Sequence, residues 1–283
     1  MKLFVAVYND IRLLAHFLRH YDQAGITQFF IATTSEYKDA ITKFMESYNI
    51  TLYDQLNIDY HPRDGHSAAV TEMRGRNQRD DEWVVIVDLD EFIEFHQDMQ
   101  LVTANANRAG ATVVRGIMLD RFSADGQMPA FAPNSDLSSV YPVKSRFIRN
   151  VMGGCDHKGV LVKGQLQPAA GAGHHRFDGE RVFAKVLEIS HFKWIPGALE
   201  RLRLSHKAIL SAGIPWAAEH QRVFDHYDRY GRFAWESFGG QMAKNFELEL
   251  PNRCAKCGAA ISEAEYEFSK ERFGRALCRA DQR

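Results

Sequence analysis

The chain has 283 residues, of which 45% are hydrophobic and 25% are charged, and its formal net charge is −1. This length suits one large domain, or a catalytic domain with a small appendage. The near-zero charge excludes electrostatic attraction to nucleic acid or to an anionic membrane as the main mode of binding. The first ten residues lack the apolar region of a secretory signal peptide, and no stretch approaches the roughly 20 apolar residues of a membrane span. We therefore expect a cytoplasmic protein.

The first part of the chain alternates short apolar strands with amphipathic helices. Strands are predicted at residues 3–8, 29–33 and 50–53, and helices at residues 11–24, 37–48 and 67–80. Alternation of this kind is typical of a parallel sheet whose strands are connected by helices. The pattern predicts an α/β fold, with a mostly parallel central sheet flanked by helices.

The next predicted strand, residues 83–88, ends in a cluster of carboxylates. Side chains alternate along a strand, so Asp88 and Asp90 are expected to project to the same side. Two such carboxylates repel each other and lose hydration, so they need a positive partner, either a group of arginines and lysines or a divalent cation. We favour the cation, because the carboxyl end of a strand is where open α/β sheets bind ligands.

The chemistry of the Asp-x-Asp pair points to Mg²⁺ or Mn²⁺, since zinc prefers nitrogen and sulfur ligands. These ions keep several water or phosphate ligands, which suits a substrate with a diphosphate. The metal would neutralise charge on a departing nucleoside diphosphate. The alternative is that Asp88 and Asp90 only cap a helix that begins near Glu91.

The remainder of the main domain is less regular. In order, we predict a helix at 101–109, a strand at 112–119, a loop at 120–139, a basic segment at 144–150, a glycine-rich segment at 153–159, a strand at 186–189, and helices at 197–211 and 215–230. Lys144, Arg146 and Lys193 are candidates for contacts with diphosphate oxygens. The alternative for each is a solvated basic surface.

Several motifs together resemble one family. They are Trp-Val-Val-Ile-Val-Asp-Leu-Asp-Glu-Phe at 83–92, Val-Tyr-Asn-Asp at 7–10, Leu-Leu at 13–14, His-Tyr at 20–21, Gly-Ile at 25–26, Lys144, Gly-His-His-Arg-Phe at 173–177 and Ser-His-Phe-Lys-Trp at 190–194. They resemble the nucleotide-sugar-dependent glycosyltransferases of the GT-A fold, and more narrowly the bacterial family-2-like transferases with a DxDEF motif. The resemblance covers about residues 1–235.

The resemblance implies roles for individual residues. Asp88 and Asp90 would contact the metal and the sugar nucleotide, and His191 would supply a later ligand to the metal or the diphosphate. From the residues alone, His191 is only a residue at the edge of a strand. Asn9 and Asp10 stand where the family usually has Asn-Glu, and the shorter acid is still expected to contact the nucleotide.

Two adjacent histidines and three carboxylates complete the predicted site. His174 and His175 would point in opposite directions in an extended segment, so at most one faces the site, and we assign His174 to the nucleotide. For an inverting reaction a carboxylate must accept the proton of the acceptor hydroxyl. Glu219 is the first candidate, although it also suits an i,i+3 surface pair with Arg222. The second is Asp120, and Glu91 is expected to orient the loop or contact the acceptor.

The C-terminal tail is predicted to be a separate unit, with a boundary between residues 1–250 and 251–283. Cys254 and Cys257 form a C-x2-C-G turn, and Cys278 follows at a spacing typical of structural zinc modules. Asp281 stands where the fourth cysteine would be. It is either an oxygen ligand for Zn²⁺, or a distant histidine completes the site, or the module has lost its metal.

The sequence thus predicts a glycosyltransferase that uses Mn²⁺ or Mg²⁺ and a uridine or guanosine diphosphate sugar. The acceptor is expected to be a saccharide or a lipid-linked saccharide, without nucleic acid; peripheral membrane contact is compatible with the sequence. One alternative is a metal-dependent phosphohydrolase or nucleotidyltransferase. Another is a non-catalytic adaptor with a zinc-binding tail.

Overall fold

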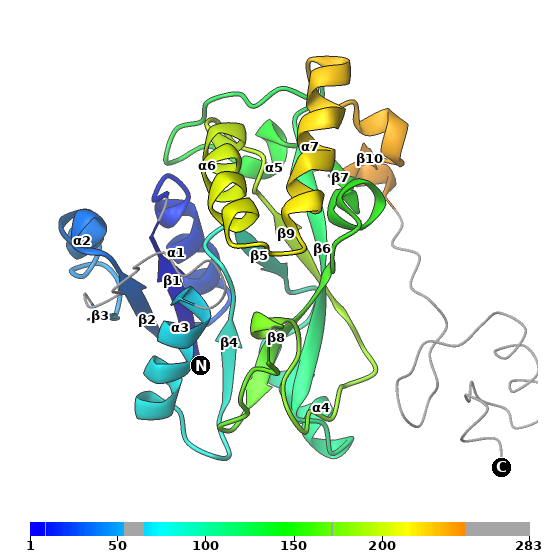
Figure 1. Cartoon of the computed structure of the whole chain (residues 1–283). Helices are drawn as coiled ribbons and strands as arrows, with labels where there is room; N and C mark the ends of the chain where they lie inside the picture. The colour runs from blue at the N-terminus through cyan, green and yellow to red at the C-terminus, as the bar shows by residue number, and fades with distance from the viewer. Residues whose placement is uncertain (9, 54–64, 171, 247–283) are drawn as a thin grey trace, which may run out of the picture.

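The computed structural model describes residues 1–8, 10–53, 65–170 and 172–246 (Figure 1). Asn9 and the whole predicted zinc tail, with Cys254, Cys257, Cys278 and Asp281, lie outside the described residues. The domain boundary near residue 250 and the zinc site therefore stay predictions.

The described residues form a mixed α/β structure. The strands are β1 (Lys2–Val7), β2 (Gln28–Thr33), β3 (Ile50–Tyr53), β4 (Trp83–Ile86), β5 (Glu91–Glu94), β6 (Val113–Phe122), β7 (Val143–Ser145), β8 (His157–Lys163), β9 (Leu187–His191) and β10 (Gln241–Met242). The α-helices are α1 (Leu14–Gln23), α2 (Ser35–Thr42), α3 (Gly65–Asn77), α4 (Met99–Arg108), α5 (Leu137–Val140), α6 (Ala198–Ser211) and α7 (Ala217–Tyr230). Shorter helical turns are η1 (Ile148–Met152), η2 (Gly173–His175), η3 (Trp235–Phe238) and η4 (Ala243–Asn245).

The strands form one sheet in the order β10-β7-β6-β8-β4-β1-β2-β3. Strands β4, β1, β2 and β3 are parallel, as expected for strands connected by helices. Beyond β4 the sheet continues through β8, β6, β7 and β10 with antiparallel pairs. Strand β9 pairs parallel with β6, and β5 pairs antiparallel with β9. The predicted α/β class, with a central sheet flanked by helices, is confirmed.

Alternate residues of β1 are buried on the two faces of the sheet. Val5 belongs to the larger core, together with Phe17 and Leu18 of α1. Phe4 belongs to a second cluster with Val70 of α3, so α1 and α3 cover opposite faces. This two-sided burial explains why β1 reads as a continuous apolar run rather than as an alternating one.

Strands β5, β7, β8 and β10 were not predicted, and two of them, β5 and β8, shape the acidic cluster. Asp88 and Asp90 lie in a turn after β4, and the chain continues as strand β5, so the helix-capping alternative is wrong. The glycine-rich segment leads into β8, which carries Lys158. The Tyr21 hydroxyl of α1 donates to the Glu91 carbonyl at 2.8 Å and accepts from the Ile93 amide at 3.1 Å, so α1 fixes the start of β5.

Gly164 ends β8 in a conformation that other residues rarely adopt. Its φ is +69°, and an added Cβ would lie 2.5 Å from the Asp80 carbonyl oxygen. We expect Gly164→Ala to lower the free energy of unfolding by about 1–3 kcal/mol, because both the backbone strain and the clash oppose the substitution. Gly179→Ala is the matched control for a urea denaturation series, since Gly179 has a φ of +66° but open space around it. Equal losses in the two variants would contradict a role for the clash.

Candidate functional site

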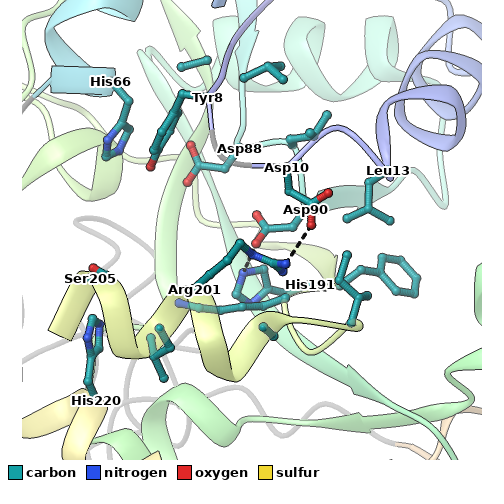
Figure 2. A pocket seen from close by; sticks show the side chains of 18 residues that line it. Tyr8, Asp10, Leu13, His66, Asp88, Asp90, His191, Arg201, Ser205 and His220 are labelled. Atoms are coloured by element: carbon teal, nitrogen blue, oxygen red, sulfur yellow. Dashed lines mark ion pairs between the residues drawn. The ribbon is translucent and has the colours of Figure 1, made fainter. Parts of the chain in front are cut away.

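A cavity of about 290 Å³ lies at the carboxyl ends of β1 and β4, beside the end of β9 and against α6 (Figure 2). This volume is close to the lower end of small-molecule pockets. The lining residues are Ala6, Val7, Tyr8, Asp10, Leu13, His66, Asp88, Leu89, Asp90, His191, Phe192, Lys193, Ile195, Ala198, Arg201, Leu202, Ser205 and His220. The predicted residues Asp10, Asp88, Asp90, His191 and Lys193 therefore meet in one pocket.

Lys158 is the positive partner of the first half of the acidic cluster. Its Nζ donates to Asp88 Oδ2 at 2.7 Å and to both Glu91 oxygens, at 3.0 and 2.8 Å. The Asp88 amide donates to Glu91 Oε2 at 2.8 Å, which closes the turn. Lys158 is thus the expected positive partner of Asp88, and it was not among the residues predicted from the sequence.

The two carboxylates that share Lys158 have pKa values shifted in opposite directions. The side chains of Lys158 and Glu91 are each only 3% exposed, and burial raises the pKa of Glu91 to about 7 against the opposing effect of Lys158. For Asp88 burial also opposes ionisation, but the charges of Lys158 and His66 outweigh it and hold its pKa well below the usual range. Glu91 does not line the pocket, and its described contacts are with Lys158 and with the backbone of the turn.

His191 stands between Asp90 and Asp120 because of the register of three strands. It pairs with Glu91 of β5 and with Asp120 of β6. His191 Nδ1 lies 3.0 Å from Asp120 Oδ1, and Nε2 lies 3.4 Å from Asp90 Oδ2. Burial lowers the pKa of His191, but the charges and hydrogen bonds of Asp90 and Asp120 have a larger, opposite effect. The resulting pKa is about 10. The imidazole is therefore a buried cation that faces the second aspartate of the motif, and its Nε2 must release its proton before it can bind a metal ion.

Asp120 is completely buried, and its oxygens are already used. Oδ1 accepts from Trp194 Nε1 at 2.9 Å besides its contact with His191, and Oδ2 accepts from the Ile148 amide at 2.9 Å. The prediction that Asp120 accepts the proton of an acceptor hydroxyl is wrong, since no substrate in the pocket can reach it. Its position suits a group that orients His191, with the Nδ1 proton directed to the carboxylate.

We expect Asp120→Asn to weaken Mn²⁺ binding by about 10–100-fold, the usual effect of removing the carboxylate behind a ligating histidine. The amide can donate to Nδ1, which would favour the imidazole tautomer with its proton on Nε2. Mn²⁺ titration followed by electron paramagnetic resonance measures the change. Circular dichroism checks that the variant folds, and unchanged Mn²⁺ affinity in a folded variant would contradict the role.

The residues present fit a divalent cation held by Asp90 and His191. A carboxylate oxygen and an imidazole nitrogen backed by a carboxylate are suitable ligands for Mn²⁺, and Mg²⁺ ordinarily needs only one or two carboxylates plus phosphates. Among the described residues, no three His, Cys, Asp or Glu side chains form a ready metal cluster. Asp88 is engaged by Lys158, so most remaining ligands would come from the substrate and water.

Three basic side chains lie near Asp10 and the end of β9. Arg201 Nη1 lies 3.0 Å from Asp10 Oδ2, and Arg12 Nε donates to Asp10 Oδ1 at 2.9 Å. The Lys193 ammonium lies 5.7 Å from the Trp194 ring centre. In the part of the chain that the structure describes, it makes no ion pair, so it remains available for an anionic group.

Besides Glu91 and Asp120, four predicted residues that the structure describes lie outside the pocket lining. Arg146 Nε donates to Asp156 Oδ2 at 2.7 Å. Lys144 pairs with Glu188 at 2.9 Å. His174 is buried beside Phe177, and burial drives its pKa well below the usual range. Glu219 is half-buried at the start of α7, and burial raises its pKa.

The predicted site did not include several lining residues, among them Tyr8, His66, Arg201 and His220. Tyr8 and His66 stack with ring centres 5.6 Å apart, and Arg201 and His220 come from α6 and α7. Tyr8 lies next to the predicted Asn9-Asp10 pair, so its position in the chain could have identified it. The other three come from helices whose placement depends on the tertiary structure. No helix among the described residues is long and apolar enough to cross a membrane.

No protein-family model and no curated protein matches the sequence. Among solved structures, a protein described as a glucose-1-phosphate thymidylyltransferase from Bacillus anthracis is 12% identical, with 71% of this chain and 93% of that chain covered and a TM-score of 0.38. HddC from Yersinia pseudotuberculosis is 7% identical, with coverages of 58% and 76% and a TM-score of 0.32. The 4-diphosphocytidyl-2C-methyl-D-erythritol synthase from Anaerococcus prevotii is 12% identical, with coverages of 58% and 69% and a TM-score of 0.32. Likeness at this level carries no argument about the activity of this chain, so the functional case rests on the pocket.

Proposed function

We propose that this chain is a metal-dependent glycosyltransferase that moves a sugar from a nucleoside-diphosphate sugar to a saccharide or lipid-linked acceptor. The observation that carries the proposal is the Asp90–His191–Asp120 arrangement, which opens into a pocket at the carboxyl ends of two parallel strands. Such a pocket, with oxygen and imidazole ligands, suits a divalent cation and a diphosphate.

Asp90 and His191 would hold Mn²⁺ or Mg²⁺, and the ion would supply charge neutralisation for the leaving diphosphate. Asp10 has Arg201 as a cationic neighbour, Asp88 has Lys158, and Asp90 would face the metal ion itself. This pairing lowers the repulsion that an entering diphosphate would meet.

Lys193 and Arg201 would orient the phosphate oxygens. Lysine binds phosphate as a point charge, whereas the planar guanidinium offers two parallel donors. Glu219, the predicted general base, lies at the start of α7 but does not line the pocket, so the group that removes the proton from the acceptor is left unassigned.

The test is a panel of nucleoside diphosphates and nucleotide sugars, measured with and without Mn²⁺ by calorimetry and by product analysis. Metal-dependent binding followed by release of a free sugar or a glycoside supports the proposal. Release of phosphate or pyrophosphate would favour a phosphohydrolase or nucleotidyltransferase instead. Metal-dependent binding without turnover would favour a non-catalytic adaptor, and no binding of any nucleoside diphosphate would refute the proposal.

A further inference from the structure

One end of the pocket differs from the rest in its chemistry. Figure 2 shows Ser205 of α6 and His220 of α7 beside each other, away from Asp10 and Asp90. The ring centres of His206 and His220 lie 6.1 Å apart, so α6 and α7 contact each other at this point. This end of the pocket carries a hydroxyl and an imidazole, and the carboxylates Asp10 and Asp90 lie away from it.

His220 is an uncharged group at neutral pH. Burial, together with the charges of Lys193 and His206, lowers its pKa to about 4. Its Nδ1 is buried without a hydrogen-bond partner, and the Nδ1 of His206 is in the same state. Within the described ranges, neither His220 Nε2 nor the Ser205 hydroxyl has a hydrogen-bond partner in the protein. Buried polar groups normally have partners, so this end has unused hydrogen-bonding capacity.

Apolar side chains complete the surroundings of these polar groups. Ile195, Ala198 and Leu202 line the same pocket from the start of α6 and the segment before it. A surface that combines neutral donors and acceptors with apolar area matches a sugar ring, which has hydroxyl groups and C–H faces. A phosphate is better bound by cationic groups, and of these Lys193 lies close enough for its charge to lower the pKa of His220.

We propose that Ser205 and His220 bind the hydroxyl groups of a glycosyl unit, and that they separate a neutral sugar subsite from the charged diphosphate subsite. The inference rests on the proposed function, because it assigns the two parts of one nucleotide sugar to two parts of one pocket. The hydroxyl groups belong either to the donor sugar or to the acceptor, and the experiment distinguishes these sources.

The experiment compares Ser205→Ala and His220→Ala with the wild type. Ser211→Ala and His96→Ala are the matched controls, since both residues are exposed and neither lines the pocket. Calorimetry with Mn²⁺ measures affinity for a nucleoside diphosphate and for the corresponding nucleotide sugar. Two kinetic measurements follow: hydrolysis of the nucleotide sugar without acceptor, and transfer to a panel of methyl glycosides.

We expect each pocket variant to bind the nucleoside diphosphate within about twofold of the wild type. Affinity for the nucleotide sugar should fall by about tenfold, since a hydrogen bond to a substrate hydroxyl is lost. If donor affinity and hydrolysis are unchanged but transfer to methyl glycosides falls, the subsite binds the acceptor sugar. The Ser205 variant removes only one oxygen, so it keeps the test valid if the His220 variant fails to fold.

Equal losses of affinity for the nucleoside diphosphate and the nucleotide sugar would overturn the inference, as would unchanged behaviour in every measurement. These outcomes leave the proposed function intact. Conversely, a wild-type protein that binds no nucleoside diphosphate refutes the proposed function itself, so the two failures are distinguishable.

Discussion

Asp90→Asn is expected to reduce the Mn²⁺-supported affinity for a nucleoside diphosphate by at least about 100-fold, more than the loss of a carboxylate behind a metal ligand usually causes. The substitution removes a negative ligand from the side that faces His191 Nε2, which lies 3.4 Å from Asp90 Oδ2. It also leaves the His191 imidazole with Asp120 as its remaining carboxylate contact. Calorimetry at fixed Mn²⁺ concentration measures the change.

Asp81→Asn provides the control for Asp90→Asn. Asp81 is an exposed carboxylate just before β4, so its loss removes the same charge from the chain without changing the pocket. Metal-dependent affinity that survives in Asp90→Asn, or that falls equally in both variants, would contradict the assignment of Asp90 as a ligand.

Lys158→Met is expected to have the largest effect on stability, lowering the free energy of unfolding by about 3–5 kcal/mol. Methionine keeps the length and apolar stem of lysine but leaves Glu91 buried without its cation. The contribution of Asp88 is smaller, because its side chain is 44% exposed and solvent screens its charge. Urea denaturation measures the loss, and Lys163→Met at the other end of β8 is the control, since the Lys163 ammonium donates to the Asn107 side chain in an exposed hydrogen bond and contacts no buried carboxylate among the described residues.

The loss of unfolding free energy in Lys158→Met should depend on pH. Burial already raises the pKa of Glu91 to about 7 in the presence of Lys158, and removal of the lysine raises it further. A raised carboxyl pKa gives stability that is present at low pH and lost as the pH rises through the folded-state value. The difference between variant and wild type should therefore be larger at pH 8 than at pH 5. A difference that is independent of pH would show that Glu91 does not respond to the loss.

Much of the site could be predicted from the sequence because it lies at strand ends. The apolar run before Asp88 indicates the ligand-binding edge of the sheet, so a short-range pattern is sufficient for Asp88 and Asp90. His191 was assigned to the site only through the family resemblance, since its position at the edge of a strand has no such meaning by itself. Pairing between β5, β6 and β9 brings Asp90 and His191 together.

The rest of the site depends on which distant segments become neighbours. Lys158 reaches the acidic turn because β8 pairs antiparallel with β4, and a glycine-rich segment before it concealed that strand. Asp120 also ends a predicted strand, but Trp194 and Ile148 enclose it, which no local pattern reveals. Glu219 was chosen from the residue types in its helix, whereas the lining residue is the adjacent His220.

The contact between Asp120 and His191 also has a consequence for folding. The two residues are 71 positions apart in sequence, and Asp90 comes from a third segment of the chain. Closing such large loops costs entropy before the contacts form, so this arrangement is expected to appear late in folding rather than in an early local structure. The arrival of Mn²⁺ affinity during refolding would then report the completion of the sheet.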